Sequence, residues 1–464
     1  MRAKSICPPL LKTTILALSL SLTSTAFASG EHNIKRDIND PKVIAIINGD
    51  VLPTSSANIM LSAINRGKKK LSMIEFLQGS IENKLLTDYG VDILGIETVI
   101  PSGGVGFDLD VALEDQFINV IRLNYEAPLQ AYISKHFARG NLLSAATQPF
   151  SMTRKQLKPH TVMKNKQTLG FTEDQIANAK TLELIRYQLP GQVKEHAITL
   201  WDIYRRQNVQ GKDILHKADI RFVKTQVQQR LGSLLVLHWM DTHSGLSTLE
   251  IDAIKELVFN KHFKKLYITH QGLVSVLHKD NPRLTEMAKK VTQKEINVYY
   301  KAHKEDYKQI NKARGRQIIS SSQDDINAAF KAIKAGQAFE EVAKKYSTQK
   351  DKKGRVSVDT GWIKRQDTKQ PWLKTLLFLQ PIGEASRPYR SPQLRGAEDV
   401  HWRIILTDEK EEYYQAADSG GVTYPVSRIL AERKLTKEFG TLRKRLLGDS
   451  KIRLNPALLQ ATNK

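Results

Sequence analysis

The stretch that decides the fold is ARGRQIISS (Ala313–Ser321) followed by DDINAAFKAIKAGQAFEEVAKKYS (Asp324–Ser347). The first segment is typical of a strand and the second of an amphipathic helix. The turn and strand DTGWIKRQD (Asp359–Asp367), an apolar segment that ends in FLQPIGEAS (Phe378–Ser386) and the strand HWRIILTD (His401–Asp408) follow in this order. Together they predict one compact α+β unit of roughly 95 residues, a normal size for a small domain.

The chain before this unit is longer and has mostly helical patterns. Val43–Leu52 is typical of a strand, a tight turn and a short strand. Ser72–Tyr89 has one apolar stripe at helical spacing, and we expect Gly90 to end that helix. Two capping boxes, Ser247–Glu250 and Thr292–Glu295, begin further helices. The helices predicted between Gly90 and Ser247 are Leu109–Tyr125, Leu129–Phe137, Glu173–Tyr187, His196–Gln207 and Asp219–His238.

The segment after the unit cannot fold by itself. Val426–Leu447 has the pattern of a basic amphipathic helix, and Lys451–Leu454 alternates like a strand. A lone helix and a lone strand cannot bury their own apolar faces. We therefore expect both to pack on the N-terminal part of the chain, where Val43–Ile47 could be the sheet partner.

The N-terminal segment predicts export. Three basic residues precede the apolar run Ile15–Leu22, and the small-residue site Ala26–Ala28 follows. This is the pattern of a secretory signal peptide that is cleaved after Ala28. The run is too short to span a membrane, so the alternative, a retained signal anchor, is less favoured.

Composition limits the chemistry of the mature chain. The 464 residues, 41% of them hydrophobic, are enough for two or three folded domains. The single cysteine, Cys7, lies in the signal segment, so disulfides, a thiol nucleophile and thiolate metal ligands are all excluded after cleavage. An exported chain without cysteine suits a bacterial periplasm.

The net charge of +23 favours anionic partners. For an exported chain these are acidic unfolded clients, or anionic membrane or polysaccharide surfaces; a solvated surface that limits aggregation is the simplest interpretation. The basic residues are not interleaved with aromatic residues, so no nucleic acid is expected. The pairs His238/His243 and His262/His270 lack the spacing of a zinc motif, and no phosphate loop or nucleophile elbow occurs, so we predict no metal and no cofactor.

The compact unit resembles a parvulin-type peptidyl-prolyl isomerase domain. That family has a first strand of the type R-H-I-L, followed by the helix motif G-x-x-F-x-x-x-A-x-x-Y/F-S and a G-G-x-L-G-W turn. A G-E-x-S-x-P motif and a last strand of the type G-Y-H-I-I-K-L come after the turn. The corresponding residues here are Arg316–Ile319, Gly336, Phe339, Ala343, Tyr346, Ser347, Ser357–Trp362, Gly383–Pro388 and His401–Leu406.

The flanks resemble SurA-type periplasmic chaperones. Val43–Asp50, Phe76–Tyr89, Val291–Tyr307 and Leu430–Asn455 are similar to segments of that family, whereas residues 90–285 match it only as generally helical. The resemblance implies an α+β fold: a large, mainly helical chaperone-like domain, completed by the C-terminal helix and strand, with one parvulin-like domain inserted. The expected boundaries are 1–28 for the signal peptide, 29–290 for the helical domain, 291–312 for a linking helix, 313–408 for the parvulin-like domain, 409–424 for a linker and 425–464 for the C-terminal helix and strand.

The polar site of the family is altered in this chain. Parvulins keep two histidines and a cysteine or aspartate around the prolyl peptide. The resemblance puts the first histidine at Gln317, the cysteine or aspartate at or near Gln349, and the second histidine at Trp402, with His401 beside it. Since neighbouring strand residues face opposite sides, we expect Trp402 to face inward with Ile404, and His401 to face out.

These substitutions predict a weak or lost isomerase. No catalytic residue is assigned, and the candidates are Gln317, Gln349, His401 and Trp402. Glutamine forms hydrogen bonds but does not titrate. Trp362 and Phe339 are expected to be core residues. The expected walls of an apolar substrate pocket are Trp372, Leu373, Phe378 and Trp402.

Three functions remain open at this point. The first is a periplasmic folding factor that binds unfolded or extended exported proteins through its helical domain. The second is an active peptidyl-prolyl cis-trans isomerase. The third is a component dedicated to one export or polysaccharide system, in which the fold is only a scaffold.

Overall fold

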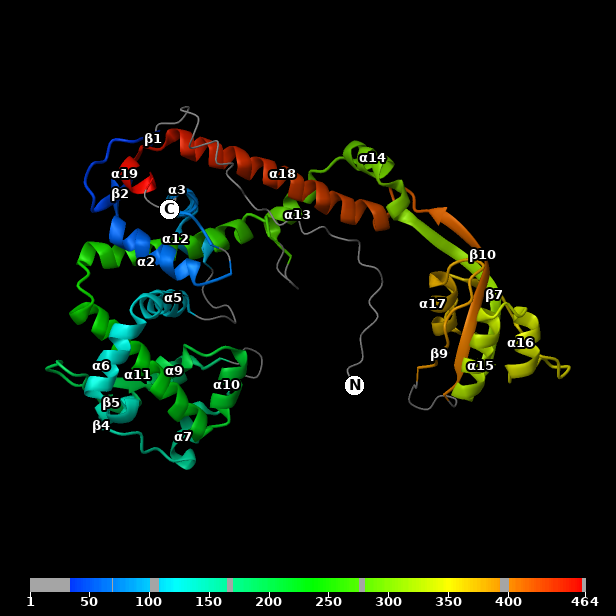
Figure 1. The fold of residues 1–464 in the computed structure, drawn as a ribbon, viewed down its shortest axis with the longest axis horizontal. Helices are drawn as coiled ribbons and strands as arrows, with labels where there is room; N and C mark the ends of the chain where they lie inside the picture. The colour runs from blue at the N-terminus through cyan, green and yellow to red at the C-terminus, as the bar shows by residue number, and fades with distance from the viewer. Residues whose placement is uncertain are drawn as a thin grey trace. The chain divides into compact units, whose positions relative to one another are not determined.

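The computed structural model describes residues 34–68, 70–100, 108–164, 170–274, 280–392 and 400–460, so the predicted signal peptide lies outside the described residues. The chain divides into two compact units (Figure 1). The inserted unit is Glu286–Ala431, and the helical unit combines the segments before and after it. Both units contain helices and strands, which confirms the predicted α+β class.

A small sheet joins the two ends of the helical unit. Its strand order is β1-β11-β2-β3, with β1 at Ile34–Lys35 and β3 at Asp50–Pro53. The C-terminal strand β11 (Ile452–Leu454) runs antiparallel to β2 (Val43–Ile47), with Ile452 opposite Ile47. This is the pairing that the alternating pattern suggested, and it buries both apolar edges in the core of the helical unit.

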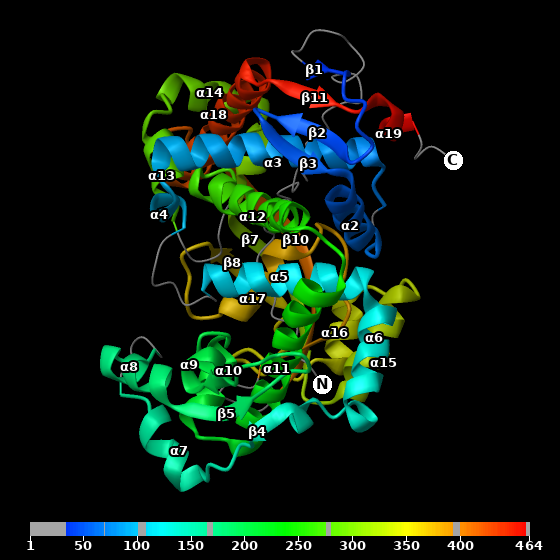
Figure 2. The same cartoon turned by 90° about the vertical axis from the view of Figure 1, so that its left-hand side faces the viewer.

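Helices cover this sheet and form most of the unit. The long helices α3 and α12 lie side by side in Figure 2 and pack together. Capping boxes at Ser72 and Ser247 begin them. The helices of this part are α2 (Thr54–Asn65), α3 (Met73–Leu94), α4 (Ile96–Val99), α5 (Leu109–Asn124), α6 (Glu126–His136), α12 (Thr248–His270), α13 (Pro282–Lys289) and the C-terminal part of α18 (Gly420–Asp449), with the short α19 (Pro456–Gln460) at the end.

The prediction that Gly90 ends α3 is wrong. The helix continues to Leu94 because Gly90 serves a close helix contact: a Cβ atom there would lie 2.7 Å from Cε1 of Phe263 on α12. Phe263 is fully buried. The glycine therefore lets α3 and α12 approach each other at their C-terminal ends.

The middle of the helical unit contains a three-stranded sheet that the helical patterns did not predict. Its order is β4-β5-β6, and all its pairs are antiparallel. The predicted helix Glu173–Tyr187 changes to strand β5 at Glu183, and the predicted helix His196–Gln207 begins as strand β6. Cross-strand pairing overrides the local pattern here. The elements are η1 (Ala138–Gly140), η2 (Leu142–Ala145), β4 (Ala146–Gln148), α7 (Arg154–Thr161), α8 (Glu173–Thr181), β5 (Glu183–Tyr187), β6 (His196–Thr199), α9 (Leu200–Tyr204), α10 (Val209–His216) and α11 (Ile220–His243).

The inserted unit is built on a four-stranded antiparallel sheet of order β8-β7-β10-β9. Helix α17 covers one face of this sheet, and α15 and α16 cover the other (Figure 1). The elements are α14 (Gln293–Ala302), η3 (Lys304–Tyr307), β7 (Lys308–Ser320), α15 (Gln323–Lys334), α16 (Phe339–Tyr346), β8 (Asp359–Lys364), α17 (Pro371–Leu379), β9 (Tyr389–Arg390) and β10 (Trp402–Tyr414).

Two expectations for this unit need correction. The single helix predicted for Asp324–Ser347 is broken at Gly336, whose φ of 90° no right-handed helix accommodates. Most of the linker predicted at 409–424 is regular structure, since β10 runs to Tyr414 and α18 begins at Gly420. The extra strand length is polar and is held by ion pairs across β7 and β10, such as Lys312 to Glu411 at 2.8 Å, so it lacks the apolar alternation that marks a strand in sequence.

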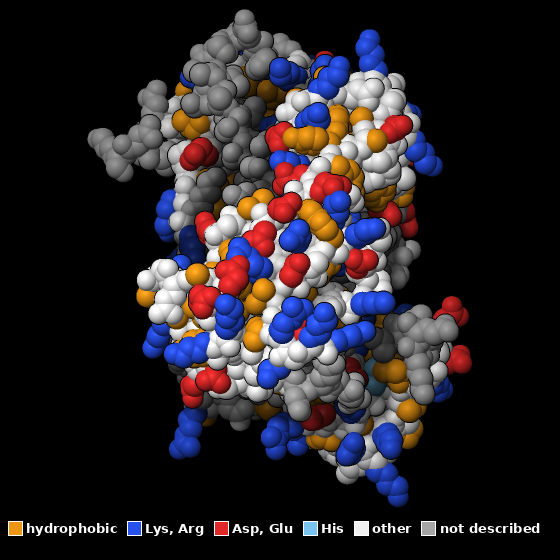
Figure 3. Space-filling view, turned by 90° about the vertical axis from the view of Figure 1, so that its right-hand side faces the viewer, with side chains coloured by type: hydrophobic (Ala, Val, Ile, Leu, Met, Phe, Trp, Pro, Cys, Tyr) orange, Lys and Arg blue, Asp and Glu red, His pale blue; other side chains and the backbone are white. Residues whose placement is uncertain are grey.

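Figure 3 shows one face of the structure, on which basic side chains are interspersed with acidic ones. Of the two predicted core residues, Phe339 is buried but Trp362 is 40% exposed, with the ammonium of Lys312 4.6 Å from its ring centre. Within the described ranges, no helix has the length and apolar character needed to cross a membrane.

Candidate functional site

The register of β7 and β10 decides which side chains can meet. Gln317 lies opposite Ile405, and Ile318 lies opposite Ile404. Directly opposite residues point to the same face of a sheet, and neighbours along a strand point to opposite faces. Ile318 and Ile404 are buried on the face covered by α15 and α16. Gln317 and Arg403 therefore share the other face, which is covered by α17.

A hydrogen-bonded polar cluster lies on the α17 face. The Gln317 side chain is only 5% exposed. Its Nε2 donates to Oε1 of Gln349 at 3.1 Å, and its Oε1 accepts from Nη1 of Arg403 at 2.9 Å. Nε of Arg403 donates to Nε2 of His401 at 2.9 Å. Trp372 of α17 lies beside the cluster, with its ring centre 5.3 Å from the Arg403 guanidinium and 5.8 Å from the His401 ring.

The cluster is one chain of donors and acceptors with a fixed charge at its centre. Because Nε2 of His401 accepts a hydrogen bond, its ring is neutral in this arrangement and carries its proton on Nδ1. The Arg403 guanidinium stays protonated at any ordinary pH, and the two glutamines do not titrate. The cluster can hold a backbone or an acceptor group by hydrogen bonds. Among the residues that the structure describes, the contacts of this cluster include no carboxylate and no thiolate that could act as a base.

Ser386 has a structural role that the sequence did not reveal. It is the serine of the G-E-x-S-x-P word and is buried. Its backbone N–H donates to the carbonyl of Ile405 at 2.7 Å, and its Oγ accepts from the N–H of Ile405 at 2.9 Å. This pair of bonds fixes the segment after α17 to the edge of β10, which explains why a small hydroxyl residue is needed there.

The placement of Trp402 in the polar site is wrong. Trp402 shares a face with Ile404 as expected, but that face packs against α15 and α16, away from Gln317. The family's last-strand histidine directly precedes two isoleucines, and the residue that directly precedes Ile404-Ile405 here is Arg403. An alignment of the last-strand motif on this pair of isoleucines would have identified Arg403 as the residue at the position of the family's histidine.

The other predicted residues divide between site and core. His401 was expected to face out, but it is half-buried in the cluster. Leu373 is buried in the core under α17, and Phe378 is half-buried against the same core. Of the predicted pocket walls, Trp372 is the one whose described contacts place it beside Arg403 and His401.

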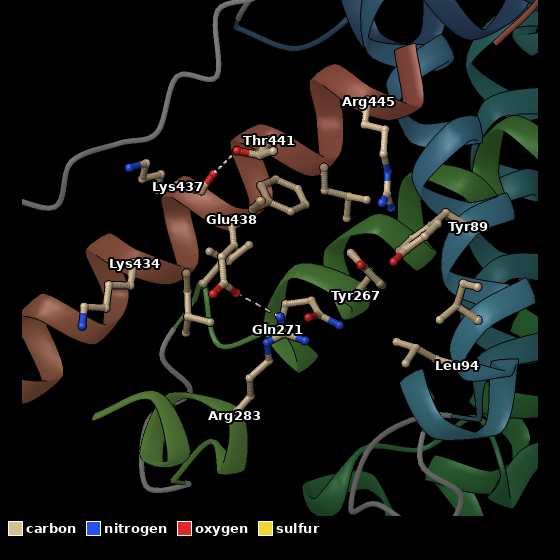
Figure 4. A pocket seen from close by; sticks show the side chains of 15 residues that line it. Tyr89, Leu94, Tyr267, Gln271, Arg283, Lys434, Lys437, Glu438, Thr441 and Arg445 are labelled. Atoms are coloured by element: carbon tan, nitrogen blue, oxygen red, sulfur yellow. Dashed lines mark hydrogen bonds and ion pairs between the residues drawn. The ribbon is translucent and has the colours of Figure 1, made fainter. Parts of the chain in front are cut away.

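A second candidate site is a groove in the helical unit. A cavity of about 600 Å³ opens between the C-terminal ends of α3 and α12, the start of α13 and the helix α18. Its side chains are drawn in Figure 4. They are Tyr89, Ile93, Leu94, Tyr267, Gln271, Leu273, Arg283, Lys434, Leu435, Lys437, Glu438, Phe439, Thr441, Leu442 and Arg445. No candidate residue was assigned here from the sequence, because the helices come from three distant segments.

Among the residues that the structure describes, no group of three or more His, Cys, Asp or Glu side chains is placed to hold a metal ion.

The comparisons with known proteins gave one family match and several solved structures. Residues 291–405 match the family model of the PPIC-type PPIase domain. None of the curated proteins compared matches the chain significantly. Among solved structures, PrsA from Bacillus anthracis is 19% identical over 53% of this chain and 89% of its own, with a TM-score of 0.19. PrsA from Bacillus subtilis is 18% identical over 55% of this chain and 89% of its own, with a TM-score of 0.18.

A Campylobacter jejuni chain, described as one of two structurally related SurA-like chaperones, is 10% identical and covers more of the molecule. The match spans 89% of this chain and 99% of that chain, with a TM-score of 0.24. These TM-scores are below 0.5, so the family match is the more informative comparison. Residues 291–405 are similar in sequence to the PPIC-type PPIase domain.

Proposed function

We propose that this protein is a folding factor that binds unfolded or extended exported polypeptides, and that its prolyl isomerase activity is weak or lost. The observation that carries the proposal is the network of Gln317, Arg403 and His401. The network includes Gln317, where the resemblance puts the first titratable residue of the parvulin family, and it lies in a unit whose sequence matches the PPIC-type PPIase domain.

The physical argument concerns what an isomerase must stabilise. The barrier to rotation about a prolyl peptide bond is about 20 kcal/mol and comes from amide resonance. A catalyst lowers it only by binding the twisted bond better than the planar one. Here the Nε and one Nη1 donor of Arg403 are held by His401 and Gln317, so a substrate would have to break these hydrogen bonds before it used those donors.

Two features support the proposed binding of exported polypeptides: a groove in the helical unit and the predicted signal peptide. The groove between α3, α12, α13 and α18 combines apolar walls with polar side chains, which is the usual composition of a binding site. The pattern of residues 1–28 is that of a secretory signal, so we place the protein and its clients in the periplasm.

The second candidate is an active peptidyl-prolyl cis-trans isomerase that acts on exported proteins. It is favoured by the match of residues 291–405 to the PPIC-type PPIase domain and by the position of Trp372, an aromatic wall beside the polar cluster.

Two assays on the mature chain separate these functions. The first follows cis-trans exchange of a short X-Pro peptide by NMR, with wild type and Trp372→Ala. The second follows aggregation of a chemically unfolded protein by light scattering. We expect suppressed aggregation and an exchange rate equal to the uncatalysed rate. Accelerated exchange that is lost in Trp372→Ala would establish the isomerase instead, and failure in both assays would contradict both functions.

A further inference from the structure

The groove of the helical unit has an apolar floor. Phe439 of α18 is buried, and its ring lies 6.5 Å from the ring of Tyr267 on α12. Leu435 and Leu442, one turn of α18 to either side, and Leu94 of α3 extend this floor. A cavity of about 600 Å³ lies within the range of small-molecule pockets, so it has room for two or three residues of an extended peptide.

The rim of the groove is strongly basic. Its basic lining residues are Arg283, Lys434, Lys437 and Arg445. Among the lining residues that the structure describes, the one acidic side chain is Glu438. Glu438 is already paired with Arg283 at 3.3 Å, as the dashed line in Figure 4 shows. The lining residues thus carry a net charge of about +3, from four cations and one carboxylate. Low-dielectric walls concentrate such a field and strengthen it for an incoming anion.

Neutral hydrogen-bond donors lie beside the charges. The hydroxyl groups of Tyr89 and Tyr267 are directed into the groove in Figure 4. The guanidinium of Arg445 lies 5.7 Å from the ring centre of Tyr89. Burial raises the pKa of Tyr267 to about 12, so its hydroxyl keeps its proton and can donate at neutral pH. One end of the groove therefore offers a cation and two hydroxyl donors together.

We propose that this groove binds client segments in which an acidic side chain is flanked by apolar residues. The inference rests on the proposed client-binding function and names the class of segment that the groove selects. The carboxylate contacts the end formed by Arg445 and Tyr89, and the neighbouring apolar side chains lie on Phe439 and the leucines. A neutral segment would bury the same apolar area but bring no negative charge to Arg445, and a basic segment would add like charges.

The test measures binding of labelled octapeptides to the full mature chain by fluorescence anisotropy. One peptide has a central Leu-Asp-Phe, a second replaces Asp by Asn, and a third replaces it by Lys. We expect the acidic peptide to bind about tenfold more tightly than its amide counterpart, with a difference that shrinks in 0.5 M salt, as charge complementarity predicts.

Charge-reversal variants locate the effect. Lys437→Glu with Arg445→Glu should lower the affinity for the acidic peptide about tenfold and leave the amide peptide nearly unchanged. Lys444→Glu with Lys451→Glu makes the same change in net charge at exposed positions outside the groove lining, so it should keep the preference. Circular dichroism and thermal unfolding check that both double variants are folded.

Several outcomes would overturn the proposal. Equal affinity for the acidic and amide peptides, or the same loss in the control double, would show that the groove does not select carboxylates. Binding of phosphatidylglycerol vesicles that is lost in the groove double, with no peptide preference, would assign the groove to lipid headgroups. In either case suppressed aggregation would leave the client-binding function standing, whereas no binding and no suppression would remove both.

Discussion

Both units place an arginine beside an aromatic ring, but the surroundings of the two guanidinium groups differ. Arg403 in the inserted unit lies on the ring of Trp372 and donates to Gln317 and His401. Arg445 in the helical unit lies on the ring of Tyr89 at the rim of a cavity whose charged lining residues are mainly basic. In the first case the charge is part of an internal network, whereas in the second it faces space that a ligand can enter. The inserted unit, which carries the recognisable family motifs, is therefore less suited than the helical unit to hold an anionic ligand.

The largest expected effect tests whether the two units are independent. Phe263 is fully buried in the core below the groove, and Phe339 is buried in the inserted unit. Truncating a buried phenylalanine lowers the free energy of unfolding by about 3–5 kcal/mol through lost burial and a cavity. We expect Phe263→Ala to destabilise the helical unit and Phe339→Ala to destabilise the inserted unit. Hydrogen exchange followed by mass spectrometry on peptides from each unit measures both.

The matched pair makes this prediction specific. Each variant should accelerate exchange in its own unit and leave the buried strands of the other protected. If either variant accelerates exchange equally in both units, they unfold as one cooperative body, and the comparison between two separate sites loses its basis. Val298→Ala, at an exposed position of α14, is the control for a substitution without a cavity.

A smaller effect tests the network on the α17 face. In Arg403→Met the apolar stem is kept, but Oε1 of the buried Gln317 loses its donor. A buried polar group without a partner costs about 1–3 kcal/mol. We expect the free energy of unfolding of the inserted unit, measured by urea denaturation, to fall by that amount. Arg390→Met on the neighbouring strand β9 is exposed and should change it by less than about 0.5 kcal/mol. Equal effects of the two variants would mean that the network contributes nothing to folding.

The sequence predicted the parts of the fold that depend on local patterns. The capping boxes at Ser247 and Thr292 begin helices as expected, and the alternation of Lys451–Leu454 led to the correct partner strand. The strand β5 was missed because its residues also fit a helical pattern, although its partner β6 is near in the chain. The polar ends of β7 and β10 were missed because each is stabilised by a partner strand far away in the chain. Gly90 was misinterpreted for the same reason, since its function is a contact with Phe263 and not a helix end.

The candidate sites, too, could be predicted from the sequence only where a local motif identifies their residues. Gln317 and Gln349 were correctly placed together from the family words, and the structure joins them by a hydrogen bond of 3.1 Å. Arg403 was missed because a one-residue difference in register changes the face of a strand. The groove could not be assigned at all, because Tyr89, Tyr267 and Arg445 come from three segments that no local pattern connects.

The smallest expected effect compares one tyrosine in each unit. Burial raises the pKa of Tyr267 in the helical unit and of Tyr307 in the inserted unit to about 12 each. A folded-state pKa above the unfolded value near 10 stabilises the folded protein below pH 10, and this contribution is lost as the pH rises towards 12. The difference in absorbance at 295 nm between wild type and Tyr267→Phe, or Tyr307→Phe, isolates the titration of each side chain. Titration of either one near pH 10 would show that it is not buried as described.

Peptide binding then sharpens the contrast between the two tyrosines. Tyr267 lines the groove, whereas Tyr307 is buried against Val422 and Val426 of α18. A bound carboxylate beside Tyr267 would disfavour its phenolate by like-charge repulsion and raise its pKa further. The acidic octapeptide should therefore delay the titration of Tyr267, the amide peptide should delay it less, and Tyr307 should respond to neither. A shift at Tyr307 alone would place the peptide on the inserted unit and reverse the roles assigned to the two sites.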